Sequence, residues 1–240
     1  MINKVTIQSF ISKYYLGGLN NHVKWRIKDK VLTVYGGING SVCKVELHNF
    51  DFEDAELGIF DTDKLNKLIN ITFGDLIFTT TKTGKIHTKL HIADENFDVS
   101  YTLADTLIIP KSIYYEDPET WHLTVDLSKE DINGLIKAKS ALPDSDKMLI
   151  QSALDQEGGK RCEFVFGDME GFSDKISYNI PCSFEETNIQ LPFNSIIFKD
   201  ILKSNKDCEE ATLKLNKEGM LKLNFIGGNL NSEYFLLRNE

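Results

Sequence analysis

Apolar residues recur three or four positions apart in four segments of the chain, the spacing that places them on one face of a helix. In the first segment Ile7, Phe10, Ile11 and Tyr14 share a face, and the residues facing away are mostly polar. We therefore expect four amphipathic helices, over residues 4–16, 62–71, 127–141 and 195–206.

Shorter segments alternate apolar and polar residues, which is typical of half-buried strands. A hairpin turn is expected at residues 168–174. Each half of the chain then holds two helices and about seven strands, which predicts an α+β fold. The predicted strands cover residues 23–27, 31–35, 42–47, 56–60, 76–81, 85–92 and 97–103 in the first half, and 148–153, 162–166, 175–180, 188–192, 211–215, 220–226 and 233–237 in the second.

Two of the helices are preceded by residues that favour helix N-termini. Asp61 or Thr62 stands before the second helix, and both residue types are common N-caps. Ser128 stands three residues before Asp131, which resembles a capping box with Asp in place of Glu or Gln. These residues predict where the second and third helices begin.

The two halves of the chain are similar in sequence. At an offset of 133, Phe60-Asp61-Thr62 aligns with Phe193-Asn194-Ser195, and the apolar positions of the helices that follow also align. After a two-residue slip, Gly84 aligns with Gly219 between two predicted strands. Residues 56–92 and 188–227 therefore form an internal repeat, and we expect a symmetric object built from two similar units.

Residues 104–121 show neither a helical nor a strand period for most of their length. They contain Pro110, Pro118 and the apolar triplet Leu107-Ile108-Ile109. We interpret this segment as a connector between an N-terminal domain, residues 1–103, and a C-terminal domain, residues 122–240.

Composition favours a soluble, intracellular protein. Hydrophobic residues make up 41% of the 240 positions, and no apolar run approaches the ~20 residues that span a bilayer. The N-terminus lacks the apolar stretch of a secretory signal. The four cysteines (Cys43, Cys162, Cys182 and Cys208) are scattered and are expected to be free thiols in a reducing compartment. We expect a cytoplasmic location and no membrane contact.

Charge is unevenly distributed along the chain. The formal net charge of −9 disfavours a nucleic-acid partner at first sight, because phosphates require a basic surface. The four predicted helices, however, carry ten lysines and four acidic residues, a balance of +6 against −15 for the rest. Helical phase places Lys13, Lys67, Lys137, Lys199 and Lys203 opposite the apolar stripes, and Lys4, Lys64, Lys129 and Lys206 beside them.

Two interpretations of these lysines stay open. Amphipathic helices commonly carry lysine on their solvated face without any function. Alternatively, four basic helices that share one surface would form a basic stripe on an acidic body, which is suited to duplex DNA.

The whole pattern resembles the DNA sliding clamps of the PCNA and T-even-phage type. The repeated segments ELGIFDTDKLNKLI and IQLPFNSIIFKDIL carry the resemblance, together with the connector and the terminal EYFLLRNE. The resemblance implies a homotrimeric ring of six domains that encircles double-stranded DNA without reading its sequence and tethers the DNA polymerase. It also implies an ATP-dependent clamp loader, no catalysis and no cofactor. The length is near that of the phage proteins, which suggests a viral chain that acts in the host cytoplasm.

The resemblance further implies two protein–protein surfaces. Subunits of the family join edge to edge, which corresponds here to Phe97, Val99, Tyr101 and Leu103 of one subunit against Ile176, Tyr178 and Ile180 of the next. Partner peptides of the family bind an apolar groove beneath the connector, which corresponds here to Leu107, Ile108, Ile109, Tyr234 and Phe235. Ordinary packing of the connector is the alternative for the Leu-Ile-Ile triplet.

No motif for catalysis or phosphate binding is present in the sequence. His87 and His91 lie four apart in a predicted strand, so they should share a face, but exposed strand histidines are the simpler interpretation than a metal site. Two other function classes remain: a two-domain structural or scaffolding protein that does not contact DNA, and an enzyme whose site is assembled from distant residues.

Overall fold

The computed structural model describes residues 1–38, 40–111, 114–167, 174–184 and 188–239. The chain forms two compact units. Unit 1 consists of Met1–Ile38, Val42–Tyr114 and Asn229–Ser232, and unit 2 of Asn39–Ser41, Tyr115–Gly228 and Glu233–Glu240. The hairpin turn expected at 168–174 lies almost wholly outside the described residues.

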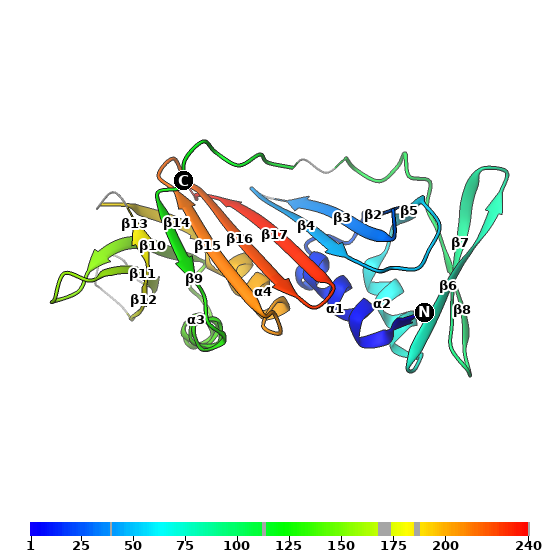
Figure 1. The fold of residues 1–240 in the computed structure, drawn as a ribbon, viewed down its shortest axis with the longest axis horizontal. Helices are drawn as coiled ribbons and strands as arrows, with labels where there is room; N and C mark the ends of the chain where they lie inside the picture. The colour runs from blue at the N-terminus through cyan, green and yellow to red at the C-terminus, as the bar shows by residue number, and fades with distance from the viewer. Residues whose placement is uncertain (39, 112–113, 168–173, 185–187, 240) are drawn as a thin grey trace. The chain divides into compact units, whose positions relative to one another are not determined.

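Unit 1 contains two α-helices that lie side by side (Figure 1). The helices are α1 (Lys4–Tyr15), followed by a 3-10 turn at Leu16–Gly18, and α2 (Thr62–Asn70). One antiparallel sheet has the order β1-β6-β7-β8, and a second group of strands has the order β4-β3-β2-β5. The strands are β1 (Ile2–Asn3), β2 (Val23–Lys28), β3 (Val31–Ile38), β4 (Ser41–Leu47), β5 (Ala55–Ile59), β6 (Asp75–Thr83), β7 (Ile86–Ala93) and β8 (Asp98–Thr102).

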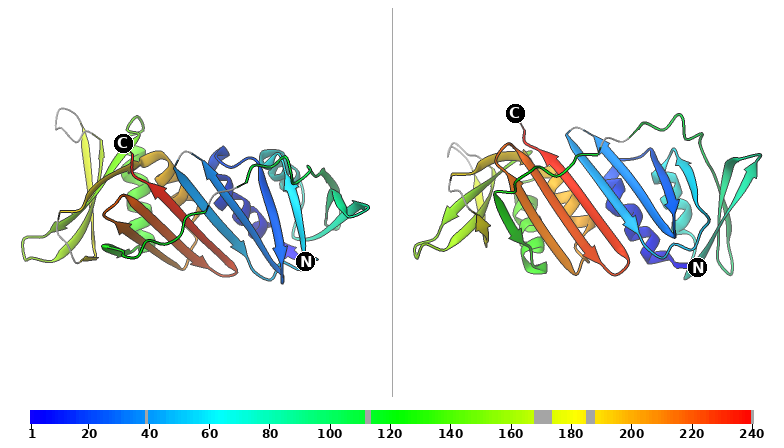
Figure 2. Two further views of the ribbon diagram at one scale, coloured as in Figure 1. Left: turned by 90° about the horizontal axis from the view of Figure 1, so that it is seen from above. Right: turned by 45° about the horizontal axis from the view of Figure 1, so that its top comes forward.

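Unit 2 repeats this arrangement, with α3 (Lys129–Ala141) and α4 (Ser195–Ser204) packed on one face of its strands (Figure 2). Its strand orders are β12-β11-β10-β14 and β13-β9-β15-β16-β17. The strands are β9 (Leu123–Asp126), β10 (Lys147–Leu154), β11 (Lys160–Gly167), β12 (Lys175–Pro181), β13 (Ser183–Phe184), β14 (Gln190–Asn194), β15 (Glu210–Asn216), β16 (Met220–Gly227) and β17 (Leu230–Leu237).

The internal repeat is visible in the helix caps. Asp61 accepts a hydrogen bond from Lys64 N (2.9 Å) at the start of α2, and Asn194 accepts two at the start of α4. The next residue is buried in both units: the Thr62 hydroxyl donates to Asn21 O (2.9 Å) and the Ser195 hydroxyl to Ser145 O (2.6 Å). Aligned residues therefore make equivalent contacts: Asp61 and Asn194 accept from amides that a helix start leaves unpaired, and the hydroxyl of the next residue donates to the carbonyl of a distant segment.

The predicted capping box of α3 is confirmed. The Ser128 side chain accepts from Asp131 N (3.1 Å), and Asp131 Oδ2 accepts from Ser128 N (3.0 Å). The short Asp side chain therefore closes the box in the place of Glu or Gln.

Aromatic side chains anchor the helices to the strands. In unit 1 Phe10 packs edge-on against Trp25 of β2 (5.9 Å between centroids), and Trp25 Nε1 donates to Tyr14 Oη (3.2 Å). In unit 2 Phe164 of β11 stacks on Phe198 of α4 (5.9 Å). Fully burying one such side chain contributes about 1.5–3 kcal/mol, so these contacts hold the helices in place.

The predicted connector contains no helix or strand in its described part, residues 104–111 and 114–121. It begins with a bridge in which Ala104 N donates to Gly58 O (2.9 Å). A Cβ at position 58 would lie 2.4 Å from Ala104 O, so β5 needs glycine there. Near its other end, Asp117 pairs with Lys222 of β16 (2.6 Å).

Candidate functional site

Exposed lysines occur on α2, α3 and α4. Lys64 and Lys67 are exposed on α2, Lys129 and Lys137 on α3, and Lys203 on α4. Lys206, just beyond α4, is also exposed, and Lys199 is half-buried. Their ammonium groups are in reach of an external anion, as the helical phase predicted.

Acidic side chains partly offset the positive charge of these lysines at two places. Lys67 pairs with Asp63 (2.5 Å), and this hydrogen bond raises the pKa of the Lys67 ammonium. On α4, burial raises the pKa of the Asp200 carboxyl, although Lys199 and Lys203 act in the opposite direction. The basic surface is therefore strongest at exposed lysines that form no ion pair within the described structure, such as Lys137 and Lys203, although Asp200 partly offsets the charge of Lys203.

The Lys4 side chain makes structural contacts at the end of α2. Its Nζ donates to Asn70 O (2.7 Å) and Thr72 O (2.6 Å), and it lies over the ring of Phe73 (5.4 Å to the centroid). A cation at the carboxyl end of a helix also opposes the negative end of the helix dipole. Lys4 thus fastens α1 to the end of α2, a role that the helical phase alone did not indicate.

The prediction that Lys13 faces solvent is wrong. Its side chain is buried, with a relative exposure of 4%. Val5 and Ser12 are the exposed residues of α1, and Lys13 is buried although it follows Ser12 directly. Lys139 of α3 is buried as well, and its Nζ donates to the carbonyls of Leu142 and Pro143 (both 3.0 Å).

The two predicted subunit edges are terminal strands of their sheets. β8 ends the order β1-β6-β7-β8, and β12 begins the order β12-β11-β10-β14. On β8 and its flanks, Val99, Tyr101 and Leu103 point into unit 1 and are buried, while Phe97 is partly exposed. On β12, Ile180 is buried, and Ile176 and Tyr178 are half-buried.

Tyrosines of these two strands fix the strands to helix starts. Tyr101 Oη accepts from Asp61 N (3.0 Å) and donates to Asp61 O (3.2 Å) at the N-cap of α2. Tyr178 Oη donates to Asp131 Oδ1 (3.1 Å) in the first turn of α3. Burial raises the pKa of both phenols.

The residues predicted for a peptide groove lie in different environments. Leu107 and Ile108 are 88% and 62% exposed, whereas Ile109 is buried. Tyr234 is wrongly assigned to the groove, because it is buried and its hydroxyl accepts from Asn205 Nδ2 (2.9 Å) next to α4. The side chain of Phe235 lies on the other face of β17. Its ring centroid is 6.3 Å from that of Tyr115, and the ammonium group of Lys222 lies over it. Phe235 is fully buried as well.

The expectation that His87 and His91 share a face is wrong. The register of β6 with β7 shifts between Thr81 and Lys82, and this bulge reverses the facing of the residues beyond it. His87 consequently forms a hydrogen bond with Thr80 (2.9 Å), and His91 forms one with Thr81 (2.8 Å). These two threonines lie on opposite faces of β6. No group of three potential metal ligands occurs among the described residues.

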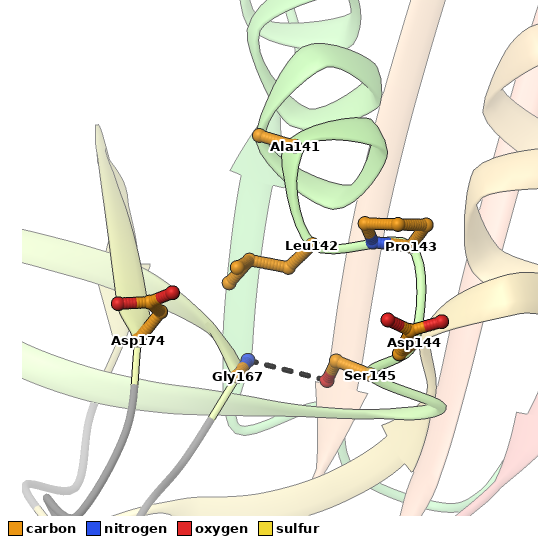
Figure 3. Close-up of a pocket in the computed structure, with 7 residues that line it drawn as sticks. All are labelled: Ala141, Leu142, Pro143, Asp144, Ser145, Gly167 and Asp174. Atoms are coloured by element: carbon orange, nitrogen blue, oxygen red, sulfur yellow. Dashed lines mark hydrogen bonds between the residues drawn. The ribbon is translucent and has the colours of Figure 1, made fainter.

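A cavity of about 530 Å³ lies at the end of α3 (Figure 3). It is lined by Ala141, Leu142, Pro143, Asp144, Ser145, Gly167 and Asp174, and Ser145 Oγ accepts from Gly167 N (3.2 Å).

None of the helices in the described part of the chain has the length and apolar character needed to cross a membrane.

Comparison with known proteins identifies the fold of this chain. No protein-family model and no curated protein matches the sequence. Among solved structures, the proliferating cell nuclear antigen (PCNA) of Entamoeba histolytica is 14% identical, with a TM-score of 0.77 over 99% of this chain and 96% of that one. PCNA of A. fulgidus, solved with the C-terminal region of FEN-1, is 16% identical, with a TM-score of 0.77 over 100% and 97%. PCNA of Thermococcus kodakaraensis is 14% identical, with a TM-score of 0.74 over 98% and 97%.

These matches show that the chain has the PCNA fold along its whole length. The predicted α+β clamp fold, with two helices packed on sheets in each unit, is confirmed.

Proposed function

We propose that this chain, which folds like PCNA over its whole length, is a sliding clamp that encircles duplex DNA and tethers the replicative DNA polymerase. The observation that carries the proposal is the combination of this fold with exposed lysines on α2, α3 and α4 in a chain of net charge −9. A surplus of cations on the helices of an otherwise acidic protein is suited to one surface that faces DNA.

The mechanism requires contact with phosphates and no contact with bases. Lysine ammonium groups attract backbone phosphates wherever the ring stands on the DNA, so the binding free energy is nearly the same at every position. The ring is retained by topology, and weak contacts are sufficient. This role needs no catalysis and no cofactor.

The proposed assembly is a homotrimer. Residues 1–103 and 122–240 are the two clamp domains, 104–121 is their connector, and three chains make six domains. The β8 and β12 edges are the natural contacts between subunits, because an open strand edge tends to pair with another strand.

Partner proteins are proposed to bind through the connector. The A. fulgidus neighbour was solved with the C-terminal region of FEN-1, so this fold accommodates a peptide from another protein. Leu107 and Ile108 are the most exposed apolar residues in the described part of the connector and are proposed to contact such a peptide. A closed ring also needs an ATP-dependent loader to reach DNA without ends. If the chain is viral, its proposed location is the host cytoplasm.

The proposal is tested by measuring the mass of the assembly and its retention on DNA. Light scattering from about one to tens of micromolar should give a species near three times 27.3 kDa, since assembly follows mass action. Trimers are then incubated with an immobilised linear duplex whose free end is afterwards blocked with a bulky protein. Blocked duplex should retain the trimer in high salt and unblocked duplex should release it.

Each outcome separates the candidate functions. A monomer at all concentrations, or equal release from blocked and unblocked duplex, contradicts the clamp and favours the scaffolding protein. For that protein, reversing Lys137 and Lys203 to Glu changes no DNA contact, whereas for the clamp it weakens the salt-dependent binding to duplex DNA.

A further inference from the structure

A second cavity, of about 580 Å³, lies in unit 1 where β1 pairs with the start of β6. Its volume is within the ~300–1,000 Å³ range of sites that bind ligands. The described lining residues include none that the sequence predicted to have a function. Those that determine its chemistry are the apolar Met1, Phe73 and Ile77 and the acidic Asp75, Asp94 and Glu95.

The apolar side chains of this cavity are exposed. On β6, Leu76 and Phe78 are buried, whereas Ile77 between them is 51% exposed, because successive side chains point to opposite faces of a sheet. Phe73, just before β6, is 65% exposed, and its ring centroid lies 6.2 Å from that of the partly exposed Phe97. Neighbouring apolar side chains that stay exposed are typical of surfaces that bind another molecule.

The backbone and the ring of Phe73 are both held by neighbouring groups. The Asp94 carboxylate accepts hydrogen bonds from Phe73 N and Phe97 N (both 2.6 Å), which ties the loop before β6 to the turn before β8. Lys4 N donates to Gly74 O (2.9 Å), and Lys4 Nζ lies over the Phe73 ring (5.4 Å to the centroid). A surface whose groups are already in position loses less conformational entropy when it binds a ligand.

Carboxyl groups are in excess at this cavity. Asp75, Asp94 and Glu95 line it, and its described lining includes no lysine or arginine. The cations nearby are the amino group of Met1 and the ammonium group of Lys4, and the latter is already bound to two carbonyls at the end of α2. Glu95 is exposed and forms no ion pair within the described structure. The cavity therefore favours a ligand that carries positive charge.

The equivalent position in unit 2 lacks the exposed aromatic ring. β15 begins at Glu210 as β6 begins at Asp75, and the residue two positions earlier is Cys208, which is buried. The end of β16 packs closely there, since a Cβ at Gly227 would lie 3.1 Å from Cys208 Cα. The repeated architecture therefore does not require an exposed ring before this strand, and Phe73 is a feature of unit 1.

We propose that this cavity binds a segment of a partner protein in which a large apolar side chain is flanked by lysine or arginine. The apolar side chain would lie against Phe73 and Ile77, and the cations would pair with Asp75 and Glu95. Nucleic acid is disfavoured because carboxylates repel phosphates, and a second copy of the chain because it brings a net charge of −9. The site contains no described residue of the connector and does not depend on the proposed ring.

Selection of short random peptides displayed on phage tests which chemistry the cavity binds. The full-length chain with Leu107→Ser/Ile108→Ser is immobilised, so that the exposed connector residues do not capture peptides. A parallel selection uses the same chain with Ile77→Lys added, which places a positive charge in the cavity. Peptides with a large apolar residue beside lysine or arginine should be enriched in the first selection and absent from the second.

An enriched peptide is then labelled and titrated by fluorescence anisotropy against single variants of the full-length chain. Ile77→Lys should bind it at least about tenfold more weakly, because like charges meet in the cavity. Glu95→Lys should bind it about threefold more weakly, and the difference should grow at low salt. Ile86→Lys and Glu157→Lys are matched controls at exposed positions outside the cavity, and they should bind like the wild type. Thermal unfolding checks that each variant is folded.

Several results would overturn the proposal. They are a selection that enriches no peptide, enriched peptides rich in aspartate or glutamate, and equal weakening by Ile77→Lys and Ile86→Lys. Loss of the trimer mass in Ile77→Lys, with no peptide selected, would assign the cavity to a contact between copies. The mass of the wild-type assembly and its retention on blocked duplex are measured separately, so a failure of peptide binding leaves the clamp proposal standing.

Discussion

The lysines of the helices should determine how DNA binding depends on salt, and the structure ranks them. Lys137 and Lys203 are exposed and form no ion pair within the described structure, although Asp200 lies near Lys203. Lys67 is already paired with Asp63, and Lys4 is fastened to the end of α2. The double variant Lys137→Gln/Lys203→Gln is therefore the most informative perturbation.

The magnitude follows from counterion release. Each lysine that contacts a phosphate adds about 0.9 to the slope of log K against log salt concentration. Losing one contact at each of two lysines should reduce the slope by about 1.8 per chain in contact with the duplex. The ratio of wild-type to variant affinity should then shrink about tenfold between roughly 50 and 200 mM salt.

The assay is fluorescence anisotropy of a short labelled duplex at a series of salt concentrations. Lys28→Gln/Lys85→Gln is the matched control, since it removes the same charge from exposed positions on β2 and the β6–β7 turn. The control slope should equal that of the wild type. Equal slope changes in both double variants would show that net charge, and not the helix surface, governs binding, and the proposed DNA surface would be refuted.

Three further predictions concern the fold that holds this surface. Lys4→Met should lower the free energy of unfolding by about 1–3 kcal/mol, because the carbonyls of Asn70 and Thr72 lose a charged donor; urea titration measures it, and an unchanged midpoint would contradict the role. Asp200→Asn should stabilise the chain at pH 7, because burial raises the pKa of Asp200 and thus disfavours its charged form; the gain should shrink as pH falls and vanish below about pH 4, where the unfolded chain also protonates this group. Phe193→Ala should cost about 3–5 kcal/mol and Phe60→Ala less than about 1 kcal/mol, because Phe193 is fully buried and Phe60 is 49% exposed; similar losses in thermal unfolding would contradict this difference.

The elements that depend on local sequence were predictable. The caps at Asp61 and Ser128 satisfy amides within a few residues of themselves, so a short segment contains the whole interaction. The lysines of α2, α3 and α4 were predictable because each of these helices buries one stripe and leaves a solvated face.

Features that depend on distant packing were not predictable. Lys13 is buried, because burial depends on the segments that pack around a residue, which helical phase does not reveal. His87 and His91 lie on opposite faces of β7 because a bulge in the β6–β7 ladder interrupts the alternation of side chains between the two faces. Tyr234 and Phe235 are both buried, since β17 is covered on both faces, and alternation then no longer distinguishes inside from outside.

The two repeats also show where sequence similarity stops informing on function. Phe60 and Phe193 occupy equivalent positions before equivalent caps, yet Phe193 is buried while Phe60 is exposed and stacks on His22 (4.4 Å between centroids). A cap is required wherever a helix starts, so both repeats keep it, whereas exposure depends on what else each unit contacts. Outward-facing positions that differ between the units, such as Phe60, are therefore where a contact made by one unit alone should be sought, and the shared caps only keep the helices in place.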